Sequence, residues 1–311
     1  MFDWLKRRNH DAGLTAIDLQ PDSVSLARVD RSGAARPRLT ACEFQALDSS
    51  DETKLLGQFA TRYHLNHARC TTVLGAGDYQ LLLTEAPDVS PDELKAALRW
   101  RIKDLIDFHI NDAALDVFDL PGAALGAKAR EMYAVAARTE AIQKRADLLT
   151  AAGIGLEIID IPELAQRNLA ALLPEDAAGV VMLSLKPQSG LITITRQGYI
   201  YLSRALNLGV DTLHTADDPA RYFDHIVLEV QRSLDYFESH FREAPVRHLV
   251  LAPLAKPVPG LLEHLRANLG VTVGVMDLAQ LMDSDVELTP DLQARCLTTI
   301  GAALRQEEKA L

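Results

Sequence analysis

The chain has 311 residues, 48% of them hydrophobic, and a formal net charge of −11 at pH 7. That length is about twice a common single domain, so two lobes, or one core with insertions, are expected. The acidic balance argues against nucleic-acid binding, because neutralising phosphates needs a basic face. Three widely spaced cysteines, Cys42, Cys70 and Cys296, lack metal-ligand spacing and indicate the reduced thiols of a cytosolic protein.

The first expected strand is preceded by a leader, residues 1–13. Its stretch Phe2-Asp3-Trp4-Leu5-Lys6-Arg7-Arg8 mixes apolar and basic residues and lacks a secretory apolar core. We interpret the segment as a frayed end, with weak membrane contact as the alternative. No run in the chain approaches the ~20 apolar residues that cross a bilayer.

Alternating apolar residues and turn residues predict the elements of the first half. A capping box of Ser90, Pro91 and Glu93 marks the start of a helix that we expect to run to residue 107. Gly153 ends another helix. The expected strands are 15–19, 24–29, 37–47, 71–74, 79–84, 114–120, 132–137 and 156–159, and the expected helices are 51–64, 90–107, 139–152 and 162–173.

The second half follows a loop at 174–179, which we expect to separate two lobes. A long apolar stripe predicts a helix within 218–242, and Pro245 follows it. Acidic residues at 283–287 indicate a solvated loop. The expected strands are 180–185, 191–195, 249–252 and 271–276, and the expected helices are 219–242, 259–269 and 289–305.

One short motif occurs in both halves. Leu19-Gln20-Pro21-Asp22-Ser23 is echoed by Leu185-Lys186-Pro187-Gln188-Ser189, and each copy lies between two expected strands. A repeat that shares only Leu, Pro and Ser can arise by chance. If it records a duplication, it predicts two related α/β lobes, each with a hairpin turn at a shared cleft. In two-lobed folds of this kind the cleft holds nucleotide.

The order of these segments resembles the PilM family of type IV pilus assembly proteins, from about residue 14 to residue 305. The most specific match is Arg232-Ser233-Leu234-Asp235-Tyr236-Phe237. Within the family, departures at the nucleotide site resemble the branch that serves MSHA-type pili. Further segments that carry the resemblance are Ile17 to Leu26, Pro91 to Leu94, Ile159 to Ala165 and Ile300 to Arg305.

The resemblance implies an α/β, two-lobed actin-like fold (a duplicated ribonuclease H-like fold) with a small α/β domain inserted in the first lobe. The implied first lobe comprises 14–85 and 158–178, the inserted domain 86–157 and the second lobe 179–311. It also implies a cytoplasmic protein, peripheral to the inner membrane. The implied partners are other pilus platform proteins and a PilN-like bitopic membrane protein, bound through its cytoplasmic N-terminal tail.

The expected nucleotide site departs from the family pattern. Actin-like sites cradle phosphates with glycine-rich turns, because bare backbone N–H groups can approach the anion. Here Gln20 and Lys186 take the glycine positions, and each is followed by a proline that lacks an N–H group. Ser184 stands where an aspartate organises a metal-bound water. The resemblance places a nucleotide-site relic at Asp18, Gln20, Ser23, Ser25, Ser184, Lys186 and Ser189.

Hydrolysis is therefore not expected, and we assign no resident cofactor, with binding of Mg-ATP as the open alternative. Asp18 and Lys186 have opposite charges, which predicts a weak ion pair between the lobes. The alternative is that Lys186 contacts a phosphate. No histidine has the three or four converging neighbours that a metal site needs.

A second site is expected on the inserted domain. Helical periodicity places Trp100 opposite Leu98 and Ile102, next to basic residues. An exposed Trp of this kind can anchor a peptide, or it can pack against the lobe that carries the insertion. The resemblance implies a groove for the partner peptide here, lined by Arg99, Trp100, Lys103, Phe108 and Ile110.

The function that follows is a scaffold or adaptor of a type IV, MSHA-type pilus assembly platform, without catalytic residues. Two alternatives stay open at this point. One is an active ATPase of the PilM type, and the other is the cytoplasmic domain of a GspL-like type II secretion protein.

Overall fold

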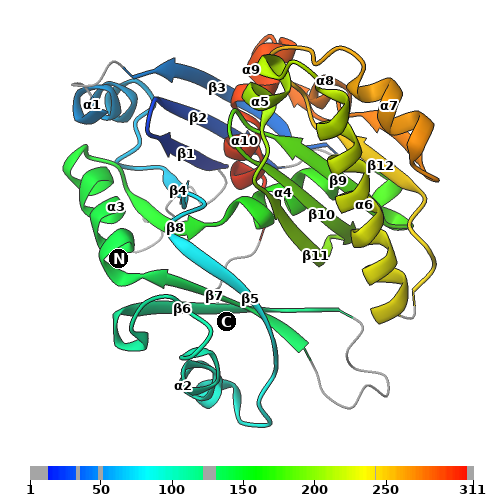
Figure 1. Cartoon of the computed structure of the whole chain (residues 1–311). Helices are drawn as coiled ribbons and strands as arrows, with labels where there is room; N and C mark the ends of the chain where they lie inside the picture. Colours follow the sequence, from blue (N-terminus) through cyan, green and yellow to red (C-terminus); the bar gives the residue numbers. More distant parts are fainter. Residues whose placement is uncertain (1–12, 33–35, 48–51, 122–130, 242, 307–311) are drawn as a thin grey trace, which may run out of the picture.

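The computed structural model describes residues 13–32, 36–47, 52–121, 131–241 and 243–306. Apart from Gly13, the expected leader lies outside these ranges. A six-stranded sheet in the order β14-β3-β2-β1-β4-β8 forms the first lobe (Figure 1). Its strands are β1 (Leu14–Gln20), β2 (Ser23–Asp30), β3 (Arg38–Ala46), β4 (Arg69–Val73), β8 (Leu156–Asp160) and the short edge strand β14 (Asp283–Ser284).

The second lobe repeats this plan in a five-stranded sheet of order β11-β10-β9-β12-β13. In each sheet two antiparallel hairpins precede parallel strands, β1-β4-β8 in one and β9-β12-β13 in the other. The duplication predicted from the motif repeat is therefore confirmed. The strands are β9 (Val180–Leu185), β10 (Gly190–Arg196), β11 (Tyr199–Leu206), β12 (His248–Leu251) and β13 (Thr272–Val275).

Two crossing helices, α4 (Pro162–Ala170) and α10 (Leu297–Ala303), cover the inner faces of both sheets. Gly301 is required where they cross, because a Cβ there would lie 2.3 Å from the carbonyl oxygen of Ala165. Asn168 of α4 donates from Nδ2 to the carbonyl oxygen of Gly301 at 2.9 Å. The backbones of the two lobes thus meet at this crossing.

Other helices cover the outer faces (Figure 1). The first sheet is covered by α1 (Glu52–Arg62) and α3 (Thr139–Ala151), and the second by α6 (Ala220–His240) and α7 (Leu261–Asn268). Three short helices are α5 (Val210–Thr215), α8 (Leu278–Leu281) and α9 (Pro290–Arg295), and 3₁₀ turns lie at Ile110–Asp112 and Pro174–Ala177. Within the described ranges, every helix is too short or too polar to cross a membrane.

A third sheet, of order β5-β7-β6, lies beneath both lobes in Figure 1. It consists of β5 (Tyr79–Glu85), β6 (Ala113–Asp119) and β7 (Glu131–Arg138), and α2 (Pro91–Ile102) packs on one face through Leu98 and Ile102. Tyr133, on the opposite face, belongs to the core of the second lobe and donates from its hydroxyl to the carbonyl oxygen of Tyr201 at 3.3 Å. The small domain therefore contacts the second lobe as well as the first.

Several elements differ from the sequence expectation. The helix expected to reach residue 107 ends at Ile102, and the Ser90 hydroxyl binds the Glu93 carboxylate at 2.9 Å instead of capping a backbone N–H group. The helix expected at 289–305 is broken at Cys296, whose φ of −100° and ψ of 8° separate α9 from α10. The acidic loop at 283–287 begins with β14, which pairs with β3. Elements β11, α5 and α8 were not predicted.

The expected boundaries of the inserted domain also differ from the packing. The boundary at residue 86 falls after β5, although β5 is hydrogen-bonded along its length to β7. The boundary at residue 157 encloses α3, although Leu149 of α3 lies in the core beneath the first sheet. Tertiary packing therefore assigns β5 to the small domain and α3 to the first lobe. The sequence alone does not mark either boundary, because both segments directly adjoin the small domain.

Candidate functional site

The turn of the first hairpin is occupied by its own side chains. Asp18 is 4% exposed, and both of its carboxylate oxygens accept hydrogen bonds from Nε2 of Gln20, at 2.9 and 3.0 Å. The two residues lie on the same face of β1 because side chains alternate along a strand. The amide of Gln20 thus covers the Asp18 carboxylate.

The serines of this hairpin are also engaged. Ser25 lies opposite Asp18 in the register of β1 and β2, and its hydroxyl is 2.5 Å from that of Thr299 on α10. Ser23 donates to the carboxylate of Asp22 at 3.1 Å. Both serines are buried, and each binds the chain itself.

Ser184 occupies the equivalent inner face of the second lobe. Its hydroxyl donates to Oε1 of Gln166 on α4 at 2.6 Å. The amide nitrogen of Gln166 in turn donates to the carbonyl oxygen of Met182 at 2.9 Å and to the hydroxyl of Thr193 at 3.0 Å. Ser184 therefore anchors β9 to the crossing helix α4.

The turn of the second hairpin, Lys186 to Ser189, is closed by another segment of the chain. Lys186 N donates to the carbonyl oxygen of Ser189 at 2.7 Å. The N–H groups of Val210 and Asp211, at the start of α5, donate to the carbonyl oxygens of Lys186 and Pro187, each at 2.9 Å. Backbone groups of this turn are thus committed to the protein.

Glycine at position 209 permits this closure. A Cβ at Gly209 would lie 2.2 Å from the carbonyl oxygen of Pro187 and 2.5 Å from the nitrogen of Gln188. Such distances are sterically forbidden, so only glycine lets the two backbones meet. The turn from Lys186 to Ser189 contains no glycine. The glycine that permits the close backbone contact, Gly209, lies instead in the segment that leads into α5.

The ion pair expected between Asp18 and Lys186 is absent from the described residues. Asp18 is bound by Gln20 instead, and the charge of Lys186 acts on Glu163, whose pKa it lowers slightly against the larger effect of burial. The expectation was wrong: the hydrogen-bond donor to Asp18 is Gln20, which lies two residues further along the same strand.

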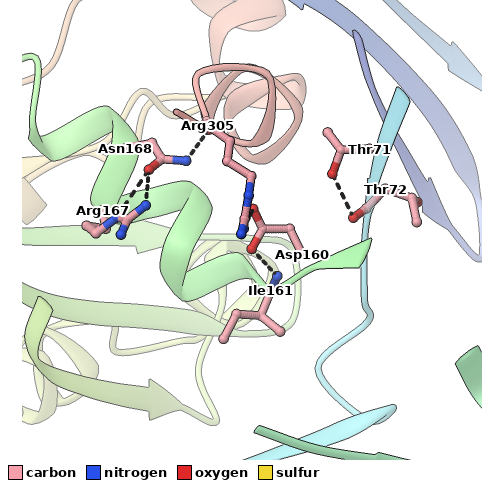
Figure 2. Close-up of polar contacts among 8 residues, drawn as sticks. Thr71, Thr72, Asp160, Ile161, Arg167, Asn168 and Arg305 are labelled. Carbon is pink, nitrogen blue, oxygen red and sulfur yellow. Dashed lines mark hydrogen bonds and ion pairs between the residues drawn. The ribbon is translucent and has the colours of Figure 1, made fainter. Parts of the chain in front are cut away.

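Two buried carboxyl groups lie where β8 continues into α4. Asp160 is ion-paired with Arg305, with 3.0 Å between Oδ2 and Nη1, and it accepts from the backbone N–H of Ile161 at 2.9 Å (Figure 2). Complete burial raises the pKa of Asp160, and the guanidinium of Arg305 offsets part of that rise. The chain after α10 is thus tied to the end of β8.

Glu163 is the second of these carboxyl groups. It accepts a 2.5 Å hydrogen bond from the hydroxyl of Tyr79, the first residue of β5. Burial raises the pKa of Glu163, while the bond from Tyr79 lowers it. The sequence marks Asp160, Glu163 and Arg305 only as members of segments that resemble the family. Their pairing, and the part played by Tyr79, were not predicted because the partners are far apart in sequence.

The residues expected to bind a peptide do not line one common groove. Trp100 is 75% exposed, and the ammonium group of Lys103 lies 5.6 Å from the centre of its ring. Arg99 points elsewhere, since its guanidinium donates to the carbonyl oxygens of Ile110 and Ala113 at 2.9 and 2.8 Å. Arg99 therefore holds the segment after α2 in place.

Phe108 lines a hollow of about 210 Å³ between the small domain and the turn that precedes β5. The guanidinium of Arg138 lies 4.4 Å from the centre of the Phe108 ring, and Asp107 pairs with the same arginine at 3.2 Å. The other residues that line the hollow are Ala76, Gly77, Asp78, Tyr79 and Gln80. Trp100 and Ile110 do not line it.

No group of three or more His, Cys, Asp or Glu side chains is arranged to hold a metal ion in the part of the chain that the structure describes. The buried carboxyl groups of Asp18, Asp160 and Glu163 are engaged by Gln20, Arg305 and Tyr79, respectively.

Comparison with known proteins supports the fold. Residues 83–216 match the family model described as "Type IV pilus assembly protein PilM". The solved "PilM-PilN type IV pilus biogenesis complex" is 18% identical, with a TM-score of 0.74, and the match covers 94% of this chain and 98% of that chain. No curated protein sequence matches.

Two further structures have the same architecture. The cytoplasmic domain of EpsL, an inner-membrane component of the type II secretion system of Vibrio cholerae, is 12% identical, with a TM-score of 0.52, and the match covers 94% of this chain and 96% of that one. A Bacteroides thetaiotaomicron protein with an actin-like ATPase fold and unknown function is 11% identical, with a TM-score of 0.52, covering 96% and 99%. The chain therefore has the predicted actin-like fold.

Proposed function

We propose that this PilM-like chain is a scaffold of a type IV pilus assembly platform whose nucleotide site is a relic. The observation that carries the proposal is the occupation of both hairpin turns by the protein itself. Gln20 covers Asp18 in the first turn, and the start of α5 binds the second. A phosphate needs backbone N–H donors; in the second turn the N–H of Lys186 is already bonded to Ser189, and Pro187 has no N–H group. Gln20 and Lys186 also put side chains where glycine would leave the backbone bare.

The proposed partner is the cytoplasmic N-terminal tail of a PilN-like bitopic membrane protein. The hollow beside Phe108 supports this placement, because it lies where the small domain meets the first lobe. A short extended peptide gains affinity from backbone hydrogen bonds and from one or two side-chain pockets. The matched family segment, residues 83–216, includes the small domain.

Within this function, we assign the chain to an MSHA-type pilus system as an MshI-like protein. The departures at Gln20, Ser25, Ser184 and Lys186 support the assignment. The proposed location is cytoplasmic, at the inner membrane through the partner, among other platform proteins. No resident cofactor is proposed.

Isothermal titration calorimetry tests both parts of the proposal. We expect no saturable heat with ATP and Mg²⁺, and saturable binding of a synthetic peptide with the N-terminal sequence of the PilN-like protein encoded beside this chain. Micromolar ATP binding with turnover would establish the ATPase alternative. Saturable peptide binding unaffected by Phe108→Ala would reject the proposed placement in the hollow, while absence of binding would reject the partner.

A further inference from the structure

Two of the three cysteines lie in one hydrophobic cluster although they are far apart in sequence. Cys42 is half-buried on β3, and Cys296 is buried at the corner between α9 and α10. Both sulfurs belong to the hydrophobic cluster on the inner face of the first sheet. Sγ of Cys296 lies 3.7 Å from the carbonyl oxygen of Glu43, the residue that follows Cys42.

The packing around this pair holds the corner in place. The guanidinium of Arg295 lies 4.7 Å from the centre of the Phe44 ring, so α9 contacts β3 on the same face, two residues beyond Cys42. The break at Cys296, where φ is −100° and ψ is 8°, turns its side chain into this contact. The thiol of Cys296 is directed at β3, where it donates to the carbonyl oxygen of Glu43, and the Cys42 side chain is near enough to raise the pKa of Cys296.

We propose that Cys42 and Cys296 are a modification site, at which a peroxide forms a reversible disulfide that ties the α9–α10 corner to β3. Cys42 is the less buried of the two cysteines, so it reacts first. Its sulfur attacks hydrogen peroxide, the O–O bond breaks, and sulfenic acid and one water form. Cys296 then attacks that sulfur, the S–O bond breaks, and the hydroxyl leaves with the Cys296 proton as a second water.

The two thiols together lose two electrons to the peroxide, so the step needs no other reactant. The pKa of Cys296 is raised by the neighbouring Cys42 side chain and by burial, so Cys296 is the less reactive of the two thiols toward peroxide. A low-molecular-weight dithiol reverses the reaction by exchange.

Cys70 provides an internal control. It lies in the core on the opposite face of the first sheet, and its thiol donates to the carbonyl oxygens of Leu65 and Ala68, each at 3.6 Å. Burial raises the pKa of Cys70 to about 12. The sheet separates Cys70 from Cys42 and Cys296, so it has no thiol partner and should stay reduced.

The test exposes the folded, reduced full-length chain to hydrogen peroxide, quenches with catalase, and alkylates free thiols after denaturation. We expect alkylated cysteines to fall from three to one, an intact mass lower by two hydrogen atoms, and a linked peptide pair that contains Cys42 and Cys296. Dithiothreitol should restore all three thiols. Cys70→Ser should form the same link, whereas Cys42→Ser and Cys296→Ser should form none.

Three results would overturn the proposal. They are retention of all three thiols, addition of oxygen to Cys42 with Cys296 still free, or a link that involves Cys70 or a second chain. The measurement on the unmodified sequence decides the matter by itself, so poor folding of Cys296→Ser would not prevent a conclusion.

Discussion

The amide nitrogen of Gln20 lies 2.9 and 3.0 Å from the two carboxylate oxygens of Asp18, at the turn between β1 and β2. A strand places residues i and i+2 on one face, so this contact is local. It converts an acidic group that faces the cleft into part of the protein's own hydrogen bonding.

Removing Gln20 should therefore weaken the fold. Gln20→Ala leaves the buried Asp18 carboxylate without this donor, so we expect the free energy of unfolding to fall by about 1–2 kcal/mol in urea denaturation. Gln188→Ala is the matched control, because Gln188 is exposed in the equivalent turn of the second hairpin. Equal effects of the two substitutions would show that the Gln20–Asp18 contact contributes nothing specific.

Gly209→Ala should lower the stability of the fold. Its Cβ would lie 2.2 Å from the carbonyl oxygen of Pro187, so α5 must move away from the turn, at a cost of about 1–3 kcal/mol. Thermal unfolding followed by circular dichroism measures the loss. Gly57→Ala in α1 meets nothing within 4 Å and should instead stabilise the helix by about 0.5–1 kcal/mol. A neutral Gly209→Ala would contradict the closed turn.

Glu163 should make stability depend on pH in a defined direction. Burial raises its pKa in the folded state above the ordinary 4.5, so the folded chain binds the proton more tightly than the unfolded chain. The stabilising contribution is complete below pH 4.5 and is lost as the pH rises through the raised value. Glu163→Gln keeps an oxygen acceptor for the Tyr79 hydroxyl and removes the charge.

The measurement is the difference in unfolding free energy between Glu163→Gln and the unmodified chain from pH 4 to pH 8. We expect the difference to move in favour of the variant as the pH rises, by at most about 1.4 kcal/mol per pH unit. A difference that stays constant with pH would mean that the folded and unfolded pKa values of Glu163 are equal.

Arg305→Leu should be severely destabilising. It leaves Asp160 fully buried without its cation, which costs about 3–5 kcal/mol. Lys95→Ala breaks the exposed pair with Asp116 and should cost less than about 1 kcal/mol. Adding Asp160→Asn to Arg305→Leu should recover stability, because the uncompensated charge disappears. Without that recovery, the loss would have to come from packing rather than from the buried carboxylate.

Trp100→Ala should leave the stability of the fold almost unchanged, so its effect on peptide binding can be measured separately. The side chain is 75% exposed, so we expect unfolding free energy to change by less than about 0.5 kcal/mol. Phe108 is partly buried beneath Arg138, so Phe108→Ala should lower both peptide affinity and stability. A Trp100→Ala variant that unfolds easily would show that the ring packs against the protein.

Much of the fold could be predicted from local sequence signals. Both hairpins follow from alternation around Pro21 and Pro187, and the outward direction of Trp100 follows from helical period. The contact between the start of α5 and the second turn depends on Gly209. The residues around Gly209 in the sequence give no indication that another backbone lies against it. The break at Cys296 lies in a run without proline or glycine, so packing against β3 imposes it.

The site was harder to predict than the fold. The Gln20–Asp18 contact could have been found, because spacing i, i+2 on a strand places both side chains on one face. Arg305 and Asp160 are 145 residues apart, and Tyr79 and Glu163 are 84 apart. Such pairs depend on how β8, β5 and α10 come together, which periodicity does not encode.

The hydroxyl of Tyr133 rests on the backbone of Tyr201, while Tyr79, at the start of the same sheet, is bonded to Glu163. The small domain is thus hydrogen-bonded both to the second sheet, through Tyr133, and to the start of α4, through Tyr79. A rotation of one lobe relative to the other that separated these two points would have to break one of the two hydrogen bonds. A partner bound to the small domain would therefore also restrict that rotation.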